Sequence, residues 1–371
     1  SAASDVYKRQ VLLPRHLNAI LWEESFLKGH VPDRTPYGYH FARELGATVT
    51  FSEATPTPGG VLGFLDKGLK YLLGFDLRHV WRNRAAIFGP GFDIVWTHTE
   101  YEHLGVAAIG LVLNRVAVPV IAQSIWLMDE WPSFGALKRM LYRKLMKQAK
   151  MATFHSPENQ KKARELGLHE VTSVVRFGIS IDSFPLKRPT FKFEPNRAIR
   201  VLAVGNDRHR DWHTLFKALG NKVGYEVRVA SNYWPSTLIA ENVSASATPQ
   251  NKMRDAYEWA DCLVVALKPN LHASGLTVIL EAVTNGLPVV ATLTGGLDFY
   301  FNGSAIQYVP VGDPEAIRTA ISVLASDETA TVRAAISAQD QLMKLDLTTH
   351  GFAKRHVQLS KELLGIPLGQ N

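Results

Sequence analysis

Short apolar runs alternate with amphipathic helical stretches along most of the chain, and this alternation constrains the fold more than any other feature. The repeated order of strand, helix and strand is typical of parallel α/β sheets. In the first half, the predicted strands are 11–14, 48–51, 94–97, 118–123, 151–155 and 172–175, and the predicted helices are 37–45, 102–113, 134–149 and 157–166.

A second series begins at residue 199. Its predicted strands are 199–204, 226–230, 262–267, 288–292 and 305–309, and its predicted helices are 212–219, 251–257, 276–284 and 314–324. A chain of 371 residues is too long for one typical core, and the proline-containing segment 182–198 separates the two series.

We therefore predict an α/β protein with two Rossmann-like domains whose parallel sheets face each other across a cleft. The predicted boundaries are 11–185 for the N-terminal domain, 186–198 for the linker, 199–345 for the C-terminal domain and 346–371 for a helical tail. Domains of this kind bind ligands at the carboxyl ends of their strands.

Residues 1–10 have neither an initiator methionine nor a periodic pattern, so we interpret them as a non-native start. The single cysteine, Cys262, lies in an apolar run and is predicted to be a buried thiol. One cysteine excludes an internal disulfide framework and fits a reducing compartment. No stretch approaches the ~20 apolar residues of a membrane span, so we expect a cytoplasmic protein.

The formal net charge is +7 and the isoelectric point is near 9.3, so an anionic partner is expected. Segments 64–84 and 137–150 mix basic residues with large apolar ones, and the second carries six lysines or arginines. Such segments suit an anionic membrane surface at which the protein is peripheral, although an ordinary solvated basic face is the alternative. The sequence contains no recognisable nucleic-acid-binding motif, which argues against that partner.

The most informative segment is 268–282, which follows a predicted buried strand. Ser274 and Gly275 open an apolar helix whose first amides are free to bind an anion. Glycine at position 275 allows a phosphate to approach the backbone. Glu281 is the one ionisable residue inside this apolar helix, and it either faces solvent or needs a polar partner such as sugar hydroxyls.

Residues 272–292, followed by Thr294-Gly-Gly-Leu297, resemble the donor-binding signature of family 4 glycosyltransferases with the GT-B fold. In that family two glutamates separated by seven residues hold the donor. The resemblance implies that Glu281 contacts the nucleotide ribose. Ala273 occupies the position of the glutamate that contacts the sugar, and the neighbouring His272 is a possible substitute. The resemblance also implies donor contacts from the Ser274, Gly275, Leu276 and Thr277 segment.

The segment 201–212 resembles the first strand and turn of the donor domain in the same family. Family members carry an arginine and a lysine there to clamp the diphosphate. Asn206 stands at the arginine position, and Arg208 and Arg210 lie close to the lysine position. Two guanidinium groups in one turn suit bidentate phosphate contacts, whereas solvated loop charges are the alternative.

The acceptor side is predicted around His98, which ends a strand that faces the cleft in this family. Glu100, Glu102 and His103 follow it closely and either bind an acceptor or move a proton, or belong to an ordinary surface loop. Ser124 stands where many members have a mechanistic histidine.

An earlier segment, 32–40, corresponds to a glycine-rich turn that approaches the donor phosphates in many members of the family. Here it offers only Gly38, with Arg34 as a possible substitute. A structural turn and a phosphate loop are both compatible with its sequence.

The resemblance implies a retaining hexosyltransferase that uses a nucleoside-diphosphate sugar in glycan, polysaccharide or glycolipid synthesis. The predicted catalytic residues are His98, Arg210 and Glu281. We expect no cofactor and no metal, because the Asp-x-Asp metal-binding signature is absent. A sugar-nucleotide epimerase of the same fold and a non-catalytic membrane-associated scaffold are the alternatives. A dinucleotide-dependent oxidoreductase is disfavoured, because neither half has Gly-x-Gly-x-x-Gly after a strand.

Overall fold

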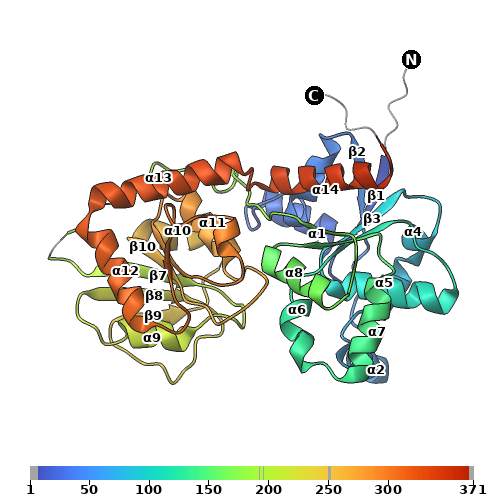
Figure 1. Ribbon diagram of the computed structural model, residues 1–371, viewed down its shortest axis with the longest axis horizontal. Helices are drawn as coiled ribbons and strands as arrows, with labels where there is room; N and C mark the ends of the chain where they lie inside the picture. The colour runs from blue at the N-terminus through green and yellow to red at the C-terminus, as the bar shows by residue number, and fades with distance from the viewer. Residues whose placement is uncertain (1–6, 192, 195, 250–251, 367–371) are drawn as a thin grey trace, which may run out of the picture. The chain divides into compact units, whose positions relative to one another are not determined.

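The computed structural model describes residues 7–191, 193–194, 196–249 and 252–366. These residues form two compact units, each built on one parallel sheet (Figure 1). The N-terminal unit contains described residues 7–28, 33–176 and 349–366, and the C-terminal unit contains 29–32 and 177–348. The last helix of the chain therefore packs with the N-terminal unit, whereas the sequence had suggested a tail after the second domain.

The N-terminal sheet has the strand order β2-β1-β3-β4-β5-β6, with every pair parallel. Its strands are β1 (Tyr7–Leu12), β2 (Ala47–Phe51), β3 (Ile94–Thr97), β4 (Val120–Gln123), β5 (Met151–Phe154) and β6 (Thr172–Val174). Its helices are α1 (Ala19–Leu27), η1 (Pro36–Arg43), α2 (Gly60–Leu73), α3 (Leu77–Arg82), α4 (Arg84–Phe88), α5 (Glu100–Leu113), α6 (Leu127–Glu130), η2 (Trp131–Ser133), α7 (Ala136–Met146), α8 (Pro157–Glu165) and α14 (Thr349–Leu363).

The C-terminal sheet has the order β12-β11-β10-β7-β8-β9 and is also parallel. Its strands are β7 (Ile199–Val204), β8 (Tyr225–Ala230), β9 (Val243–Ser246), β10 (Cys262–Val265), β11 (Val289–Thr292) and β12 (Gln307–Val309). Its helices are α9 (Trp212–Leu219), α10 (Met253–Trp259), α11 (Leu276–Thr284), η4 (Leu297–Phe299), α12 (Pro314–Ser326) and α13 (Glu328–Lys344).

The central strands are largely apolar, as expected where helices cover both faces of a parallel sheet. All residues of β10 and β11 are buried, including Cys262, as predicted for its thiol. Two apolar clusters lie against the C-terminal sheet, one centred on α11 and one on α9 and α12. After β7 the chain adds β8 and β9 on one side of that strand, and it then crosses back to add β10, β11 and β12 on the other side. This reversal of strand order between β7 and β10 is where parallel α/β sheets bind ligands.

Several predicted boundaries are wrong. The first strand begins at Tyr7, so residues 7–10 belong to the fold, contrary to the interpretation of 1–10 as non-native. The predicted helix 37–45 is a 3-10 segment, because Tyr37 and Gly38 have positive φ angles that interrupt a helix. Residues 1–6 and 367–371, Asn251 of a predicted helix and Pro195 of the predicted linker lie outside the described residues. No helix among those described is long and apolar enough to cross a bilayer.

Candidate functional site

Three loops of the C-terminal unit meet at the carboxyl edge of its sheet, after β7, β10 and β11. The amide of Lys268 donates to the carbonyl of His209 at 2.8 Å, and the amide of Asp211 donates to that of Ala266 at 2.9 Å. The third loop joins through Thr294, whose hydroxyl accepts from the amide of Asn270 at 3.2 Å. The backbone therefore fixes the register of all three loops.

Helix α11 begins at this edge without a side-chain cap on its amino end. Its N-cap residue, Gly275, has φ 87°, a left-handed conformation that favours glycine. A Cβ atom at this position would lie 2.6 Å from Cγ1 of Val265. The loop and helix thus present backbone amides and the positive end of the helix dipole, a combination that favours anions in proteins.

The guanidinium of Arg210 lies beside this helix start. Its Nε donates to the carbonyl of Val204 at 2.9 Å, and its Nη1 donates to the hydroxyl of Ser274 at 2.8 Å. Burial lowers the pKa of Arg210 to about 10, so the group stays charged at neutral pH. Gly205 is required for this placement, because a Cβ atom there would lie 2.1 Å from Nε of Arg210.

The two arginines predicted to clamp a diphosphate are separated by the fold. Arg210 is buried against the start of α11, whereas Arg208 is exposed on the loop. Asn206 is also exposed, and its side-chain oxygen accepts from the amide of Asn232 at 2.7 Å, which holds it toward the end of β8. Among the predicted residues of the α11 segment, His272, Ser274, Gly275 and Leu276 are buried and Thr277 is exposed.

Glu281 is buried on α11, with 7% of its surface exposed, so the solvent-facing alternative is wrong. The hydroxyl of Tyr257 on α10 donates to its carboxylate at 2.5 Å. Burial raises the pKa of Tyr257 well above its usual value, and the charge of Glu281 adds to the effect, so Tyr257 remains a hydrogen-bond donor. Sequence reasoning did not single out Tyr257, because the pair joins residues of two helices that only the fold brings together.

A second polar group near α11 consists of Asp207, His209 and His272, which we call the Asp207 cluster. His209 Nδ1 lies 3.1 Å from one carboxylate oxygen of Asp207, and His272 Nε2 lies 2.9 Å from the other. Burial works against ionisation of Asp207, but the hydrogen bonds from the two histidines outweigh it and hold the pKa of the carboxyl well below its usual range. Asp207 and His209 were not predicted site residues, because the third member is far away in sequence.

In the N-terminal unit, His98 follows β3 and is enclosed by aromatic rings. The ring of Tyr37 stacks on it with centroids 3.4 Å apart, and the hydroxyl of Tyr39 lies 3.1 Å from its Nδ1. Burial lowers the pKa of His98 well below its usual value, with His155 and His356 adding to the effect. His98 is therefore neutral at physiological pH, and the low pKa makes it a weak proton acceptor.

The polar residues after His98 are buried, so they do not form the surface loop that was the alternative. The carboxylate of Glu100 accepts from the amides of Ile125 and Trp126 at 3.0 and 3.1 Å. His103 Nε2 lies 3.0 Å from the hydroxyl of Ser124. Both contacts join the first turn of α5 to the loop after β4. Burial raises the pKa of Glu100 to about 7 and lowers that of His103 to about 3.

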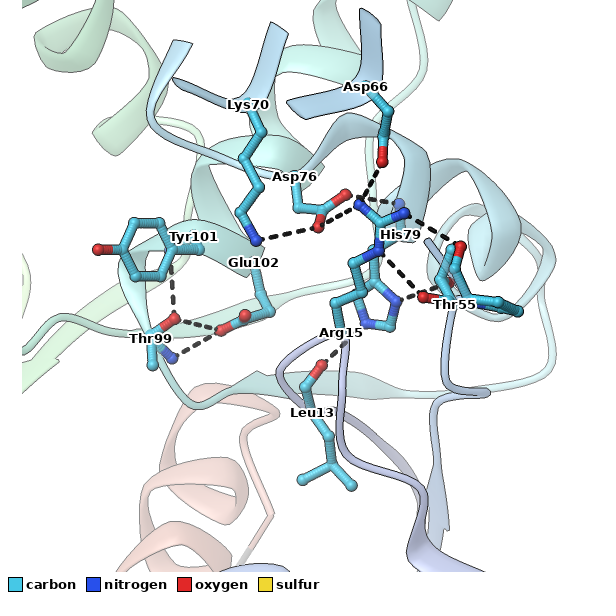
Figure 2. Close-up of polar contacts among 11 residues, drawn as sticks. Leu13, Arg15, Thr55, Asp66, Lys70, Asp76, His79, Thr99, Tyr101 and Glu102 are labelled. Atoms are coloured by element: carbon cyan, nitrogen blue, oxygen red, sulfur yellow. Dashed lines mark hydrogen bonds and ion pairs between the residues drawn. The ribbon is translucent and has the colours of Figure 1, made fainter. Parts of the chain in front are cut away.

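Glu102 forms a capping box with Thr99 at the start of α5, as Figure 2 shows. Its carboxylate accepts from the amide and the hydroxyl of Thr99 at 2.8 and 2.6 Å. Burial raises the pKa of Glu102 to about 8. These contacts give Glu102 a structural task at the start of the helix that follows His98.

The early turn with Arg34 and Gly38 does not form an open phosphate loop. Gly38 is buried, and a Cβ atom there would lie 2.4 Å from the Cβ of Thr349. Arg34 forms an exposed ion pair with Glu23 at 2.7 Å. The structure thus favours the structural-turn alternative for Gly38, and it brings Tyr37 of the same turn against His98.

With this geometry described, the chain was compared with known proteins. It matches the sucrose-phosphate synthase of Thermosynechococcus elongatus with a TM-score of 0.69 and 16% identity, covering 96% of this chain and 99% of that one. It matches HepE of Anabaena, solved with UDP and glucose, with a TM-score of 0.64 and 13% identity, covering 95% and 99%. It matches the UDP-forming trehalose-phosphate synthase of Burkholderia vietnamiensis with a TM-score of 0.63 and 11% identity, covering 96% of this chain and 100% of that one.

These likenesses and the two parallel sheets show that the fold is GT-B, as predicted. Residues 196–327, which contain the Asp207 cluster, Arg210 and α11, match the family model described as glycosyl transferases group 1. The predicted resemblance to these enzymes is confirmed over that part of the chain. A comparison with curated protein sequences gave no match.

Proposed function

We propose that the protein is a retaining glycosyltransferase that moves a hexose from a nucleoside-diphosphate sugar to a hydroxyl acceptor. The observation that carries the proposal is the buried, charged guanidinium of Arg210 beside the uncapped start of α11. A donor diphosphate carries two negative charges. The guanidinium of Arg210 and the backbone amides at the start of α11 are able to bind them. The family match covers the same residues.

Each end of the donor has a proposed contact. Glu281, held by Tyr257, accepts from the ribose hydroxyls, and Arg210 with the amides of α11 binds the diphosphate. His272 is proposed to contact the sugar, because Ala273 offers no polar group at the neighbouring position. Asn206, Arg208 and Thr277 are exposed nearby and are proposed to line the donor.

In the proposed transfer, the bond between the anomeric carbon and the diphosphate oxygen breaks, and a bond to the acceptor oxygen forms on the same face of the sugar. Arg210 and the helix amides stabilise the charge that develops on the departing diphosphate, so the step needs no metal. The acceptor proton leaves with the departing phosphate oxygen, and His98 is proposed as an acceptor-side group that is neutral when it binds.

Nucleoside diphosphates provide the direct test of the donor site. At about 1 mM, one of them should raise the melting temperature by a few degrees, because a ligand at 100 times its Kd stabilises the folded state by about 2.7 kcal/mol. The matching nucleoside monophosphate should give a smaller shift, since it lacks the second phosphate. Differential scanning fluorimetry over a panel of bases is the measurement. The absence of a shift with every base would contradict the donor site.

We also propose that the acceptor is lipid-linked and that the protein docks on an anionic membrane, on its cytoplasmic side, through α2. An ordinary surface helix turns its apolar face inward. Helix α2 does the reverse, since its inward positions are 63, 66, 70 and 73, and two of these are Asp66 and Lys70. Its exposed apolar residues are Val61, Leu62, Phe64, Leu65, Leu69, Tyr71 and Leu72.

Ion pairs hold the inward face of α2 to the unit. Arg15 Nη1 lies 2.7 Å from the carboxylate of Asp66 and 3.3 Å from that of Asp76, and Lys70 Nζ lies 3.3 Å from Asp76 (Figure 2). The hydroxyl of Tyr142 on α7 donates to the carbonyl of Leu73 at 2.6 Å, so α7 lies beside the end of α2. Helix α7 adds a basic residue here, because Nζ of Lys138 would lie 3.0 Å from a Cβ atom at Gly74, the residue that ends α2. Apolar side chains beside basic ones fit the surface of an anionic bilayer.

The double substitution Phe64→Glu with Leu72→Glu tests this docking. We expect it to weaken binding to vesicles that contain phosphatidylserine by at least tenfold, because two exposed apolar groups are replaced by charges that the bilayer repels. Vesicle co-sedimentation is the measurement. The matched control is Val223→Glu with Ile239→Glu, which makes the same change at exposed sites of the other unit. Equal losses in the two double variants, or no binding of the parent protein, would refute the proposal.

A further inference from the structure

The Asp207 cluster contains two groups, Asp207 and His209, that have no part in the proposed transfer. The facing atoms of its three side chains, two imidazole nitrogens and a carboxylate oxygen, all lie within 4.8 Å of one another. The rings of His209 and His272 are close as well, with centroids 4.9 Å apart. Such convergence of ligand atoms from two separate loops is compatible with a bound cation.

The loops that carry the cluster are fixed before any ligand arrives. The hydrogen bonds from Lys268 to His209 and from Asp211 to Ala266 join them through the backbone. The His272 side chain is 4% exposed, so its rotation is restricted by packing. Binding an ion therefore requires little reorganisation of the chain.

The carboxylate of Asp207 is hydrogen-bonded to the histidines and not to the neighbouring guanidinium of Arg210. Arg210 directs Nε and Nη1 to Val204 and Ser274. Both oxygens of Asp207 are instead paired with imidazole nitrogens. The positive charge of Arg210 lowers the affinity of the cluster for a cation, so we expect moderate rather than very tight binding.

We propose that Asp207, His209 and His272 bind a zinc ion. Two imidazole nitrogens and a carboxylate oxygen are a preferred donor set of Zn²⁺, and three protein ligands leave a coordination position open for water or an anionic oxygen. Binding requires each ring to carry its proton on the nitrogen that faces away from Asp207. The proposed transfer does not need the ion, and the site shares His272 with the proposed donor contacts.

Titration of the metal-free protein with zinc chloride alone, followed by calorimetry, tests the site. We expect one zinc ion per chain at this site. Each of the substitutions Asp207→Asn, His209→Gln and His272→Gln should weaken its affinity at least about tenfold, because each removes a ligand. The matched control is His213→Gln, which removes an exposed histidine on α9 and should leave the affinity unchanged. Circular dichroism confirms that each variant is folded.

Zinc binding that is absent, or that keeps its affinity in all three variants, would overturn the proposal and indicate adventitious contacts with other histidines. Cobalt(II) in place of zinc provides an independent readout, since its visible absorption reports the ligands and should change in each of the three variants. The titration contains no nucleotide. A failure to bind zinc therefore leaves the nucleoside-diphosphate test intact, and a failure of that test leaves the zinc site intact.

Discussion

Replacing Arg210 by alanine is expected to lower kcat/KM for the nucleotide sugar by about 10²- to 10³-fold, measured as release of nucleoside diphosphate. This range is typical when one preorganised group that stabilises developing charge is removed. Arg210 is held by Val204 and Ser274, so it does not need to reorganise when the diphosphate departs. Its burial strengthens the interaction with an anion, because less water screens the charge.

Two further variants show whether the position or only the charge matters. Arg210→Lys keeps a cation but loses the planar fork, so we expect an intermediate loss. Arg208→Ala removes an exposed guanidinium from the same loop and should cost much less. Equal losses for the Arg208 and Arg210 variants would assign the effect to the net charge of the loop. Full activity of a folded Arg210→Ala protein would contradict the proposed role.

Replacing Glu281 by alanine is expected to have two separable effects. Activity should fall about 10- to 100-fold, because a hydrogen bond to a charged group contributes about 1.5–3 kcal/mol. Stability should fall by about 1–3 kcal/mol, because the buried hydroxyl of Tyr257 loses its partner. Steady-state kinetics and urea unfolding measure the two effects.

The double variant Glu281→Ala with Tyr257→Phe separates binding from folding. Replacing both partners of a buried hydrogen bond by apolar groups can be nearly neutral, so stability should recover. Activity should stay low, because the carboxylate proposed for the ribose is still missing. Tyr257→Phe alone keeps that carboxylate and should retain most activity. Recovery of activity together with stability in the double variant would show that Glu281 has only a structural role.

Local sequence patterns predicted several elements of both units. The predicted bounds of β3, β7, α9 and α11 agree with the structure, because each is a clear apolar or amphipathic run with distinct ends. Ser274 and Gly275 marked the start of α11 correctly. The predictions failed where the local pattern is atypical. Helix α2 was not predicted as a helix, because most of its apolar residues face outward while Asp66 and Lys70 face inward.

Among the candidate site residues, chemistry was easier to predict than placement. The sequence indicated that Glu281 needs a polar partner or solvent, and Tyr257 is the partner in the structure. It gave no means to choose between Arg208 and Arg210, because both belong to one turn. It suggested either an acceptor site or a surface loop at Glu100, Glu102 and His103, and these residues are buried.

The sequence by itself determined the two series of strands and helices, the start of α11 at Ser274 and Gly275, and the resemblance to group 1 glycosyltransferases. These features depend on residues that are neighbours along the chain. The tertiary structure decided that Arg210 packs against Ser274, that Tyr257 holds Glu281 and that His272 meets Asp207 and His209. Two of these contacts, Arg210 with Ser274 and His272 with Asp207, exist because the chain crosses back after β9 and places β10 beside β7, so that loops more than 50 residues apart share one edge of the sheet. Tyr257 and Glu281 lie on two helices, α10 and α11, whose residues belong to the same core cluster.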